Sequence, residues 1–498
     1  MSGKFLITGG YVVTLDDSLG DFDNGAVLVE DGIIKAVGRA QDISAPADAE
    51  IINAAEGVVI PGMVDTHRHV SMSLTRGIGV DQHLWHFLSN TYTRWLPATG
   101  VEEMYTSALV GCLEAIESGV TTIMDTCESF HSAEHAEAEL RGLEDSGIRA
   151  FFCYGMSGDQ YGKTPAGRSG WSARLAHVKE MAQRGANDGL VRVALQLSQS
   201  GTTPFFWMGD ELKLAQELGL LCCSHSSAVP ASNLTSDLEV RADMGYMLPG
   251  HVYNHCTNLT DHEMSLVAKT GGKIALATET DIQMGMGFPP LRMALAHGLK
   301  PSLSIDTSSA AAPDLLSQMR LQLQLQRSLD HHAAHLEHRV SMKMDFGVRD
   351  ALKWGTRNGA EAVGLGDQIG TLTPGKRADI VVITSKRALS GSAFPLGTAV
   401  LHSSPADVDL VMVDGRILKR DGALVGIDVD AIRARAREGM RRIQANLKNL
   451  RPEMSPEEIR EFFLQGEKAH RVNVANAYAQ GDIVSYLFYA NPVLRTGL

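Results

Sequence analysis

The chain has 498 residues, of which 44% are hydrophobic and 21% charged, and its formal net charge is −13. This ordinary globular composition excludes global disorder, and an acidic chain without a long basic run is unsuited to binding nucleic acid. No apolar stretch reaches the ~18 residues that span a bilayer, and the N-terminus lacks the apolar core of a signal peptide. The six cysteines form no CxxC pair, which indicates free thiols. We therefore expect a cytoplasmic protein with no nucleic-acid or membrane partner.

The two flanks of the chain share a pattern that is typical of short strands. Residues 1–56 contain KFLITGGYVVTLD and AVLVEDGIIKAVG, in which apolar β-branched runs are broken by Gly-Gly and Asp-Gly. Residues 368–426 repeat this style in IGTLTPGKRADIVVIT and VDLVMVDGRILKRDG. We expect both flanks to form one small β-sandwich domain, which would bring the ends of the intervening region together.

The intervening residues 57–367 alternate apolar runs with amphipathic segments, several of which end in Gly. The eight runs are GVVIPGMVDTHRH, VTTIMDT, IRAFFCYG, VRVALQLS, LLCCSH, HVYNHC, KIALATE and LKPSLSIDT. Eight buried strands alternating with helices predict an α/β fold of the TIM-type (β/α)8 barrel class. The structural alternative is an open doubly wound sheet, which would normally carry a phosphate or dinucleotide loop, and no such motif occurs.

The remaining residues 427–498 differ from the rest of the chain. DVDAIRARAREGMRRIQANLKNL predicts an Arg-rich helix, and a second helix follows with Ser455 as N-cap and Pro456 at its first position. The apolar face of the first helix is too narrow to favour membrane binding. We expect a helical C-terminal extension that packs on the body or on a neighbouring subunit, in a homodimer or higher homo-oligomer.

Four polar residues end three of the predicted barrel strands. His67 and His69 close the first strand, and their spacing of two directs both imidazoles to the barrel axis. His225 closes the fifth strand and Asp306 the eighth. Each alone could be a satisfied polar group of the core. Together they predict a convergent metal site at the C-terminal face, where barrel active sites lie.

At this point the sequence resembles the amidohydrolase superfamily along nearly the whole chain. The motifs are VVIPGMVDTHRH, GVTTIMD, HCTNLTDHEM, SIDTSS and NGAEAVGLGDQIGTLTPGKRADIVVI. They are specific to the branch of cytosine deaminase, guanine deaminase and triazine hydrolase. The resemblance implies one divalent metal held by His67, His69, His225 and Asp306, and places His255 near the substrate.

The same resemblance favours a mononuclear site. Binuclear relatives bridge two metals through a carbamylated Lys at the end of strand four, and VRVALQLSQSG contains no Lys. Zinc is the expected ion, although these nitrogen and oxygen ligands also suit Fe2+ or Mn2+. A bound metal lowers the pKa of its water, so Asp306 would act as general base. His255 would polarise the substrate, or alternatively orient another group by a hydrogen bond.

Two places depart from the pattern of the branch. After strand seven the chain reads Thr278-Glu279-Thr280-Asp281, where the branch usually carries Pro-x-Ser-Asn. Its deaminases carry His-x-x-Glu after strand five, where Glu shuttles protons to the ring, and this chain has Ala228 in place of that Glu. Amide, lactam or urea-like C–N hydrolysis does not need this shuttle, so it is the leading expectation for a small cyclic or aromatic nitrogen compound. The alternatives are a deaminase of a nucleobase-, pterin- or triazine-like ring with Glu279 or Glu128 as substitute shuttle, and hydrolytic dechlorination of such a ring.

Two further segments of the chain allow both a functional and a purely structural interpretation. Asp81, Leu84 and Trp85 lie in the expected lid, where Trp85 would stack on a planar substrate or serve as a core aromatic. The segment DHHAAHLEH lies beyond the last barrel strand, and we expect a solvated helix or loop rather than a second metal site.

A non-catalytic scaffold is disfavoured because such a relative would be expected to lose metal ligands, and all four are present.

Overall fold

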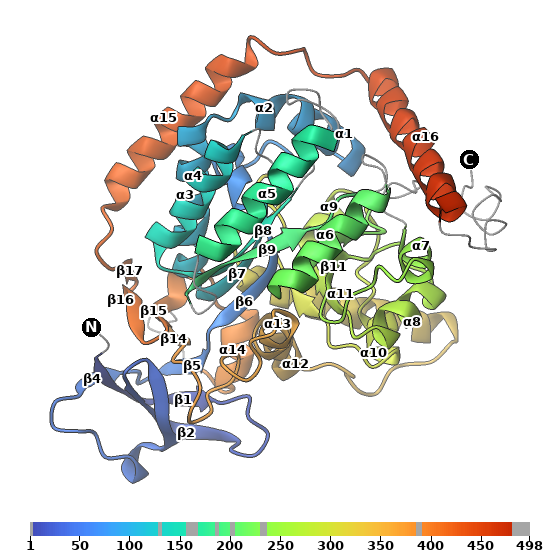
Figure 1. Cartoon of the computed structure of the whole chain (residues 1–498). Helices are drawn as coiled ribbons and strands as arrows, with labels where there is room; N and C mark the ends of the chain where they lie inside the picture. Colours follow the sequence, from blue (N-terminus) through green and yellow to red (C-terminus); the bar gives the residue numbers. More distant parts are fainter. Residues whose placement is uncertain are drawn as a thin grey trace.

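The computed structural model describes residues 3–127, 132–155, 168–184, 189–199, 205–229, 237–384 and 391–480. In Figure 1 these residues form a parallel barrel, a sheet built from both flanks at one end of it, and two long C-terminal helices that arch over the other end. This arrangement matches the predicted TIM-type barrel with an additional β domain and a helical extension.

Eight strands form the barrel in the order of the chain, as predicted. They are β6 (Met63–Arg68), β7 (Val120–Cys127), β8 (Arg149–Tyr154), β9 (Val191–Gln196), β10 (Cys222–Ser226), β11 (Val252–His255), β12 (Lys273–Leu276) and β13 (Ser302–Leu303). All seven neighbouring pairs are parallel. The chain after β13 closes the ring, because Asp306 N donates to His67 O at 3.0 Å and His69 N donates to Asp306 O at 2.8 Å.

Helices cover the outside of the barrel, and further short helices lie in the loops after β6 and β12. The outer helices are α3 (Val101–Glu117), α4 (Ala133–Ser146), α5 (Arg168–Arg184), α6 (Phe205–Leu218), α7 (Leu238–Asp243), α8 (Asp261–Lys269), α10 (Leu291–Ala296), α11 (Leu315–Leu336), α12 (Val348–Gly355), α13 (Arg357–Ala362) and α14 (Pro395–Leu401). The loop after β6 holds the 3-10 helix Val70–Thr75, α1 (Leu84–Asn90) and α2 (Leu96–Ala98), and the loop after β12 holds α9 (Thr278–Gln283).

The strands of the flanks form one nine-stranded sheet. They are β1 (Lys4–Val13), β2 (Asp21–Glu30), β3 (Ile33–Arg39), β4 (Glu50–Asn53), β5 (Gly57–Pro61), β14 (Ile380–Thr384), β15 (Val408–Val413), β16 (Arg416–Arg420) and β17 (Ala423–Leu424). The two flanks meet where β5 pairs antiparallel with β14. Val29 and Met412 from opposite halves belong to one buried cluster, so the sheet folds over a core of its own.

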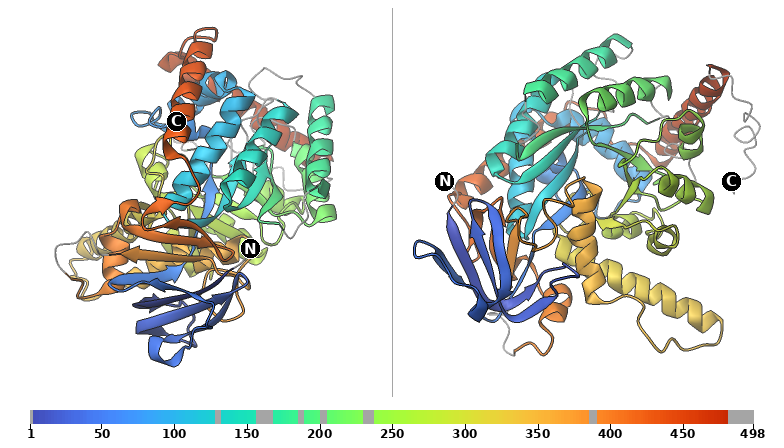
Figure 2. Two further views of the ribbon diagram at one scale, coloured as in Figure 1. Left: turned by 90° about the vertical axis from the view of Figure 1, so that its left-hand side faces the viewer. Right: turned by 60° about the horizontal axis from the view of Figure 1, so that its bottom comes forward.

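This sheet lies against the end of the barrel where the strands begin. Arg149, the first residue of β8, forms a buried ion pair with Asp379 at 3.0 Å, and Gly62 N donates to Asp379 O at 2.8 Å. The left view of Figure 2 shows the sheet below the barrel and the C-terminal helices above it. The opposite, carboxyl end of the strands is therefore left for a functional site.

The C-terminal helices α15 (Val429–Leu447) and α16 (Pro456–Gln480) explain the Arg-rich tail. Arg435 and Arg442 on α15 pair with Glu102 and Glu103 on α3, so the basic face packs on the body of the protein. Ser455 caps α16 as predicted, because Glu458 N donates to Ser455 Oγ at 3.2 Å. None of the described helices is long and apolar enough to cross a membrane.

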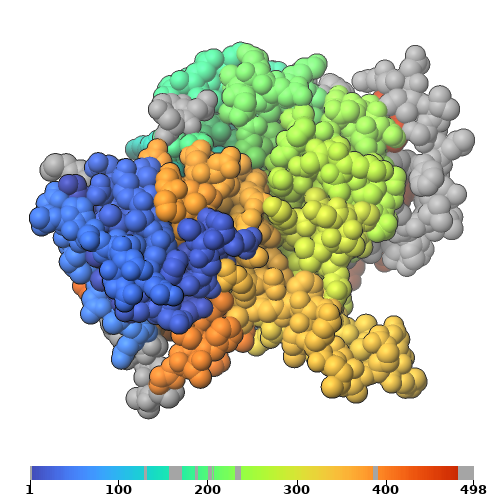
Figure 3. All heavy atoms as spheres, turned by 90° about the horizontal axis from the view of Figure 1, so that it is seen from below, coloured from blue at the N-terminus to red at the C-terminus, as the bar shows by residue number. Residues whose placement is uncertain are grey.

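The histidine-rich segment DHHAAHLEH, residues 330–338, lies at the C-terminal end of α11 and just beyond it. This end projects from the body of the molecule, at the lower right of the space-filling view (Figure 3). His332, His335 and His338 are exposed, and among the described residues no metal-binding cluster includes them. The segment is thus the solvated helix that its sequence indicates.

Candidate functional site

Two imidazoles enter the site from the end of β6. Residues two apart on a strand point to the same side, and His67 and His69 are both buried at the carboxyl end of the barrel. The edge of one ring meets the face of the other, with centroids 4.8 Å apart. The HxH spacing therefore places two nitrogen donors together, as the sequence predicts.

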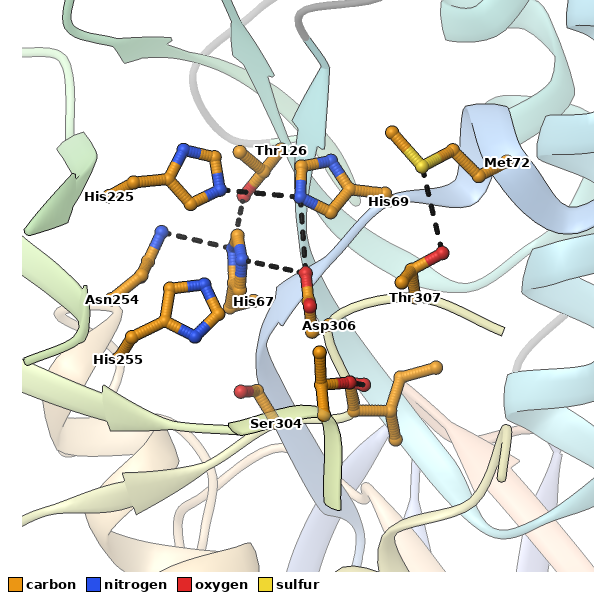
Figure 4. Close-up of polar contacts among 12 residues, drawn as sticks. His67, His69, Met72, Thr126, His225, Asn254, His255, Ser304, Asp306 and Thr307 are labelled. Carbon is orange, nitrogen blue, oxygen red and sulfur yellow. Dashed lines mark hydrogen bonds and ion pairs between the residues drawn. The ribbon is translucent and has the colours of Figure 1, made fainter. Parts of the chain in front are cut away.

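Asp306 and His225 complete the cluster from other strands (Figure 4). Asp306 Oδ1 lies 3.1 Å from His67 Nε2 and 3.2 Å from His69 Nε2. His225 Nε2 lies 3.4 Å from His69 Nε2. Ligand atoms at about 2.0–2.1 Å from a tetrahedral zinc are separated by about 3.3 Å, so these distances suit one shared ion.

The electrostatics favour the forms of these side chains that bind a metal. Burial lowers the pKa of His67 to about 3, which keeps its imidazole neutral. Burial also lowers the pKa of His225 well below its usual value. Burial alone would raise the pKa of Asp306, but hydrogen bonds from His67 and His69 hold that pKa well below its ordinary value. The cluster thus offers neutral imidazoles and a carboxylate.

Neighbouring side chains fix the imidazole of His67. Its Nδ1 lies 2.8 Å from Thr126 Oγ1 on β7 and 2.9 Å from Asn254 Nδ2 on β11. These contacts orient the ring so that Nε2 points to Asp306, and such outer contacts are usual around a ligating histidine. Neither Thr126 nor Asn254 was among the residues expected from the sequence, because their roles depend on strands that are distant in the chain.

His225 has its own supporting residues at the end of β9. Gln196 Nε2 lies 3.3 Å and Gln199 Nε2 3.1 Å from His225 Nδ1. Binuclear relatives would carry a bridging Lys at this strand end, so the position is occupied by neutral amides instead. This arrangement supports one metal rather than two.

His255 forms a buried pair with Asp281. Nδ1 of His255 lies 2.8 Å from Asp281 Oδ1, and Asp281 is fully buried in α9. Burial lowers the pKa of His255, but the charge and hydrogen bond of Asp281 outweigh it and raise that pKa above 6.5. In Figure 4 one ring nitrogen of His255 faces His67. The pair thus favours the protonated form of the imidazole beside the cluster.

The backbone is strained at two of these residues. His255 and Asp306 have φ angles of +67° and +62°, which non-glycine residues rarely adopt. The carboxyl group of Asp306 and the imidazole of His255 therefore reach the cluster from left-handed backbone, which tertiary contacts must stabilise. Such strain is concentrated at functional sites in proteins.

The residues expected near the substrate make different contacts in the structure. Ala228 is buried in an apolar cluster with Met72, Leu84 and Met284, so the wall is apolar where the branch carries its Glu. Glu279 Oε2 accepts hydrogen bonds from Ala312 N at 3.1 Å and Gln318 Nε2 at 2.9 Å, contacts that anchor the loop before α11.

The other two residues expected near the substrate are Trp85 and Glu128. The ring of Trp85 stacks on that of Phe463 of α16, with centroids 4.8 Å apart. Glu128 lies outside the described residues.

Asp281 is a further residue of this site that the sequence analysis did not single out. It stands in the motif Thr278-Glu279-Thr280-Asp281, where an acidic residue early in a short helix resembles an ordinary helix N-terminal carboxylate. Asp281 lies beside His255 only because the carboxyl ends of β11 and β12 are adjacent in the barrel. The one available signal was the departure of this motif from the pattern of the branch.

Comparisons with known proteins show which sequences and folds this chain is similar to. The model of the family described as "Amidohydrolase family" matches residues 58–418. The 5'-deoxyadenosine deaminase of Methanothermobacter thermautotrophicus is 30% identical over 433 residues, which cover 84% of this chain and 94% of that protein.

Two further similarities concern a second deaminase and a solved fold. The 5-methylthioadenosine/S-adenosylhomocysteine deaminase of Symbiobacterium thermophilum is 27% identical over 460 residues, covering 88% of this chain and 99% of that protein. A solved adenosine deaminase from Xanthomonas campestris with bound zinc has a TM-score of 0.76 at 21% identity, covering 89% and 99% of the two chains. That structural likeness concerns the fold alone.

Proposed function

The chain belongs to the amidohydrolase family, and from this premise we propose that it hydrolyses an amide-, lactam- or urea-like C–N bond of a small cyclic or aromatic nitrogen compound. The observation that carries the proposal is the presence of two possible ligand groups that share His67 at the carboxyl end of the barrel, one with His69 and Asp306 and the other with His225 and His255. Barrel enzymes bind their substrates at this end.

We assign His67, His69, His225 and Asp306 as ligands of one divalent metal. Zinc is the favoured ion because its tetrahedral geometry suits the separations of the donor atoms, and because the similar adenosine deaminase was solved with zinc. Fe2+ and Mn2+ accept the same donors. A divalent metal, when bound, acidifies a water molecule and polarises the bond under attack.

The side chains supply the proton transfers. Asp306, an ionised carboxylate at the edge of the cluster, takes the proton of the attacking water and later returns it to the leaving nitrogen. His255, held by Asp281 at 2.8 Å, donates a hydrogen bond to the substrate oxygen on which negative charge develops. Asp281 acts through His255 and is a positioning residue.

The apolar wall at Ala228 favours amide-type hydrolysis. Deamination of a ring needs a proton delivered to the ring nitrogen, and an alanine packed among methionines and leucines delivers none. Hydrolysis of an amide or lactam requires proton return only to the leaving nitrogen, which Asp306 provides.

Deamination of a nucleoside-like ring is the second candidate. The relatives named above are deaminases of deoxyadenosine and methylthioadenosine, and their similarity extends over more than four-fifths of this chain. His255 beside Asp281, whose charge and hydrogen bond raise the pKa of that imidazole, offers a donor in place of the missing Glu. This candidate needs the ring nitrogen to lie against His255.

One experiment separates the two candidates. The zinc-loaded enzyme is incubated with 5'-deoxyadenosine, methylthioadenosine, aminopyrimidines, hydantoins, cyclic ureas and a chlorotriazine, and products are followed by mass spectrometry and an ammonia assay. Addition of one water without ammonia supports amide-type hydrolysis, whereas exchange of an amino group for oxygen with ammonia released supports deamination. Loss of chloride from a chlorotriazine with neither change would contradict both. The cytoplasmic location and the homo-oligomer remain predictions.

A further inference from the structure

The barrel closes where β13 meets β6, and this junction brings three of the four predicted metal ligands together. The end of β6 carries His67 and His69, and the chain that leaves β13 carries Asp306. β13 has only two residues, and in the described part of the chain one isolated bridge, between Arg68 and Asp306, links its continuation to β6. Because regular strand pairing is so short here, side-chain contacts are needed to fix Asp306 relative to the two histidines.

Asp65 contacts both sides of this junction. Its Oδ1 lies 3.4 Å from His67 N and 3.3 Å from Ile305 N, so one carboxylate oxygen accepts hydrogen bonds from the backbone of both segments. Ile305 directly precedes Asp306, whose φ angle of +62° is one that non-glycine residues rarely adopt. Asp65 therefore holds the chain immediately before the strained ligand.

Arg68 holds Asp65 and also contacts the chain beyond Asp306. Its Nη1 lies 3.2 Å from Asp65 Oδ2, and the two side chains are only 1% and 0% exposed. Nη1 and Nη2 also donate to Pro313 O, at 3.3 and 3.4 Å, in the loop that follows Asp306. The pair thus contacts the Asp306 segment on both sides of the ligand, before it at Ile305 and after it at Pro313.

The net stability of a buried ion pair does not explain its presence at this junction. Removing two charges from water costs about as much free energy as their attraction returns, and apolar residues of similar volume often stabilise a core equally well. A guanidinium, however, donates in fixed directions from a planar group, so it constrains the geometry of its partners. At this place in the fold, the geometry that it constrains is that of the two ligand-bearing segments.

We propose that Asp65 and Arg68 are positioning residues of the metal site, which set the separation between the imidazole of His67 and the carboxylate of Asp306. His67 Nε2 and Asp306 Oδ1 lie 3.1 Å apart, a distance that suits two donors to one ion. Neither positioning residue is itself a ligand, because both act through the backbone of the ligand-bearing segments. The inference rests on the metal site of the proposed function and concerns the zinc affinity of that site.

Two double variants of the full-length protein separate positioning from charge. The apolar variant, Asp65→Leu/Arg68→Met, replaces the pair by side chains of similar volume and leaves no acceptor for His67 N and Ile305 N. The amide variant, Asp65→Asn/Arg68→Met, also lacks both charges but keeps an oxygen that can accept from the same two backbone groups. The two variants therefore differ only in the acceptor at position 65.

Two further variants complete the set. Arg149→Met/Asp379→Leu is the matched control, because it removes a buried ion pair, 3.0 Å apart, at the opposite end of the barrel. Arg68→Lys keeps the positive charge beside Asp65 but loses the planar fork that reaches Pro313 O, and it decides the test if the apolar variant does not fold. For each protein the thermal midpoint is recorded, and the dissociation constant of zinc is measured by competition with a chelator.

We expect the apolar variant to bind zinc about 10- to 100-fold more weakly than the wild type, the usual cost of losing an outer contact of a metal ligand. Arg68→Lys should weaken zinc binding about tenfold, at the lower end of that range. The amide variant should recover part of the affinity that the apolar variant loses. The matched control should bind zinc as the wild type does, whatever its thermal midpoint.

Three results would overturn the inference and leave the proposed function intact. One is wild-type zinc affinity in both the apolar variant and Arg68→Lys. Another is equal weakening in the apolar and amide variants, which would exclude the oxygen of Asp65 as the positioning contact. The third is equal weakening in the matched control, which would indicate a general loosening of the barrel. A wild-type protein that binds no zinc would instead overturn the proposed metal site and this inference with it.

Discussion

Asp281 Oδ1 lies 2.8 Å from His255 Nδ1, and both side chains are buried beside the four predicted metal ligands. The contact joins the ends of two neighbouring strands, because β11 ends at His255 and α9 follows β12. A buried carboxylate that accepts the Nδ1 proton fixes which ring nitrogen faces the cluster.

Removal of the Asp281 carboxylate should slow the reaction without removing the metal. For Asp281→Ala we expect kcat to fall by about 10- to 100-fold, as is typical when the partner of a functional histidine is lost. Asp281→Asn keeps a carbonyl acceptor, so it should recover part of the loss. The measurement is kcat and KM with metal content in parallel. A change in KM alone would show that Asp281 shapes the pocket rather than positions His255.

A carboxylate restored at Ala228 should favour ring deamination. If the missing proton shuttle separates the two chemistries, Ala228→Glu should raise ammonia release from aminopurines by about 100-fold, the lower range for a positioned acid or base. Ala228→Gln is the matched control, with a similar volume and no titratable proton. Equal rates in the two variants would show that the shape of the pocket decides the reaction.

The carboxylate of Asp306 is predicted to be both ligand and base. Asp306→Asn keeps the shape of the side chain but loses its basicity, so we expect turnover to fall by at least about 100-fold. The thermal midpoint should stay close to that of the wild type. The mechanism is wrong if this variant retains normal activity at full metal occupancy.

A buried carboxyl pair beneath the site predicts a pH-dependent stability. Burial raises the pKa of Asp125 to about 7, and burial and the charge of Asp125 raise the pKa of Glu139 well above its ordinary value. As pH rises from 3.8 to about 7, the unfolded state loses the Asp125 proton before the folded state does, so stability is lost over this range.

The variant Asp125→Asn tests this dependence. The asparagine keeps the oxygen that accepts from Val70 N and has no carboxyl proton to lose. Urea unfolding at pH 5 and pH 7.5 should show a smaller loss of stability in the variant than in the wild type. The exposed substitution Asp23→Asn is the control. Parallel losses in all three proteins would exclude the pair as the cause.

Much of the fold and of the metal cluster could be predicted from local pattern. Eight apolar runs and the HxH spacing are repeated signals within short windows, and the structure confirms the eight strands and brings His67, His69, His225 and Asp306 together. The assignment of these residues as ligands stays a prediction until metal is measured.

The remaining features depend on contacts between distant segments. Asp281 resembles a helix-terminal carboxylate until the barrel brings it to His255. Trp85 was expected to face the substrate or the core, and its partner Phe463 lies in a tail helix whose docking position no motif fixes. Hydrophobic periodicity predicts that a helix packs, but not on which surface.

The most direct test of the account is the metal content of the purified protein after reconstitution with zinc, compared with His67→Ala/His225→Ala. The exposed substitution His332→Ala serves as the control. We predict about one zinc per chain in the wild type and the control, and almost none in the double variant. A wild-type protein that binds no divalent metal, or a double variant that keeps a full equivalent, would contradict the assignment of this cluster as the catalytic centre.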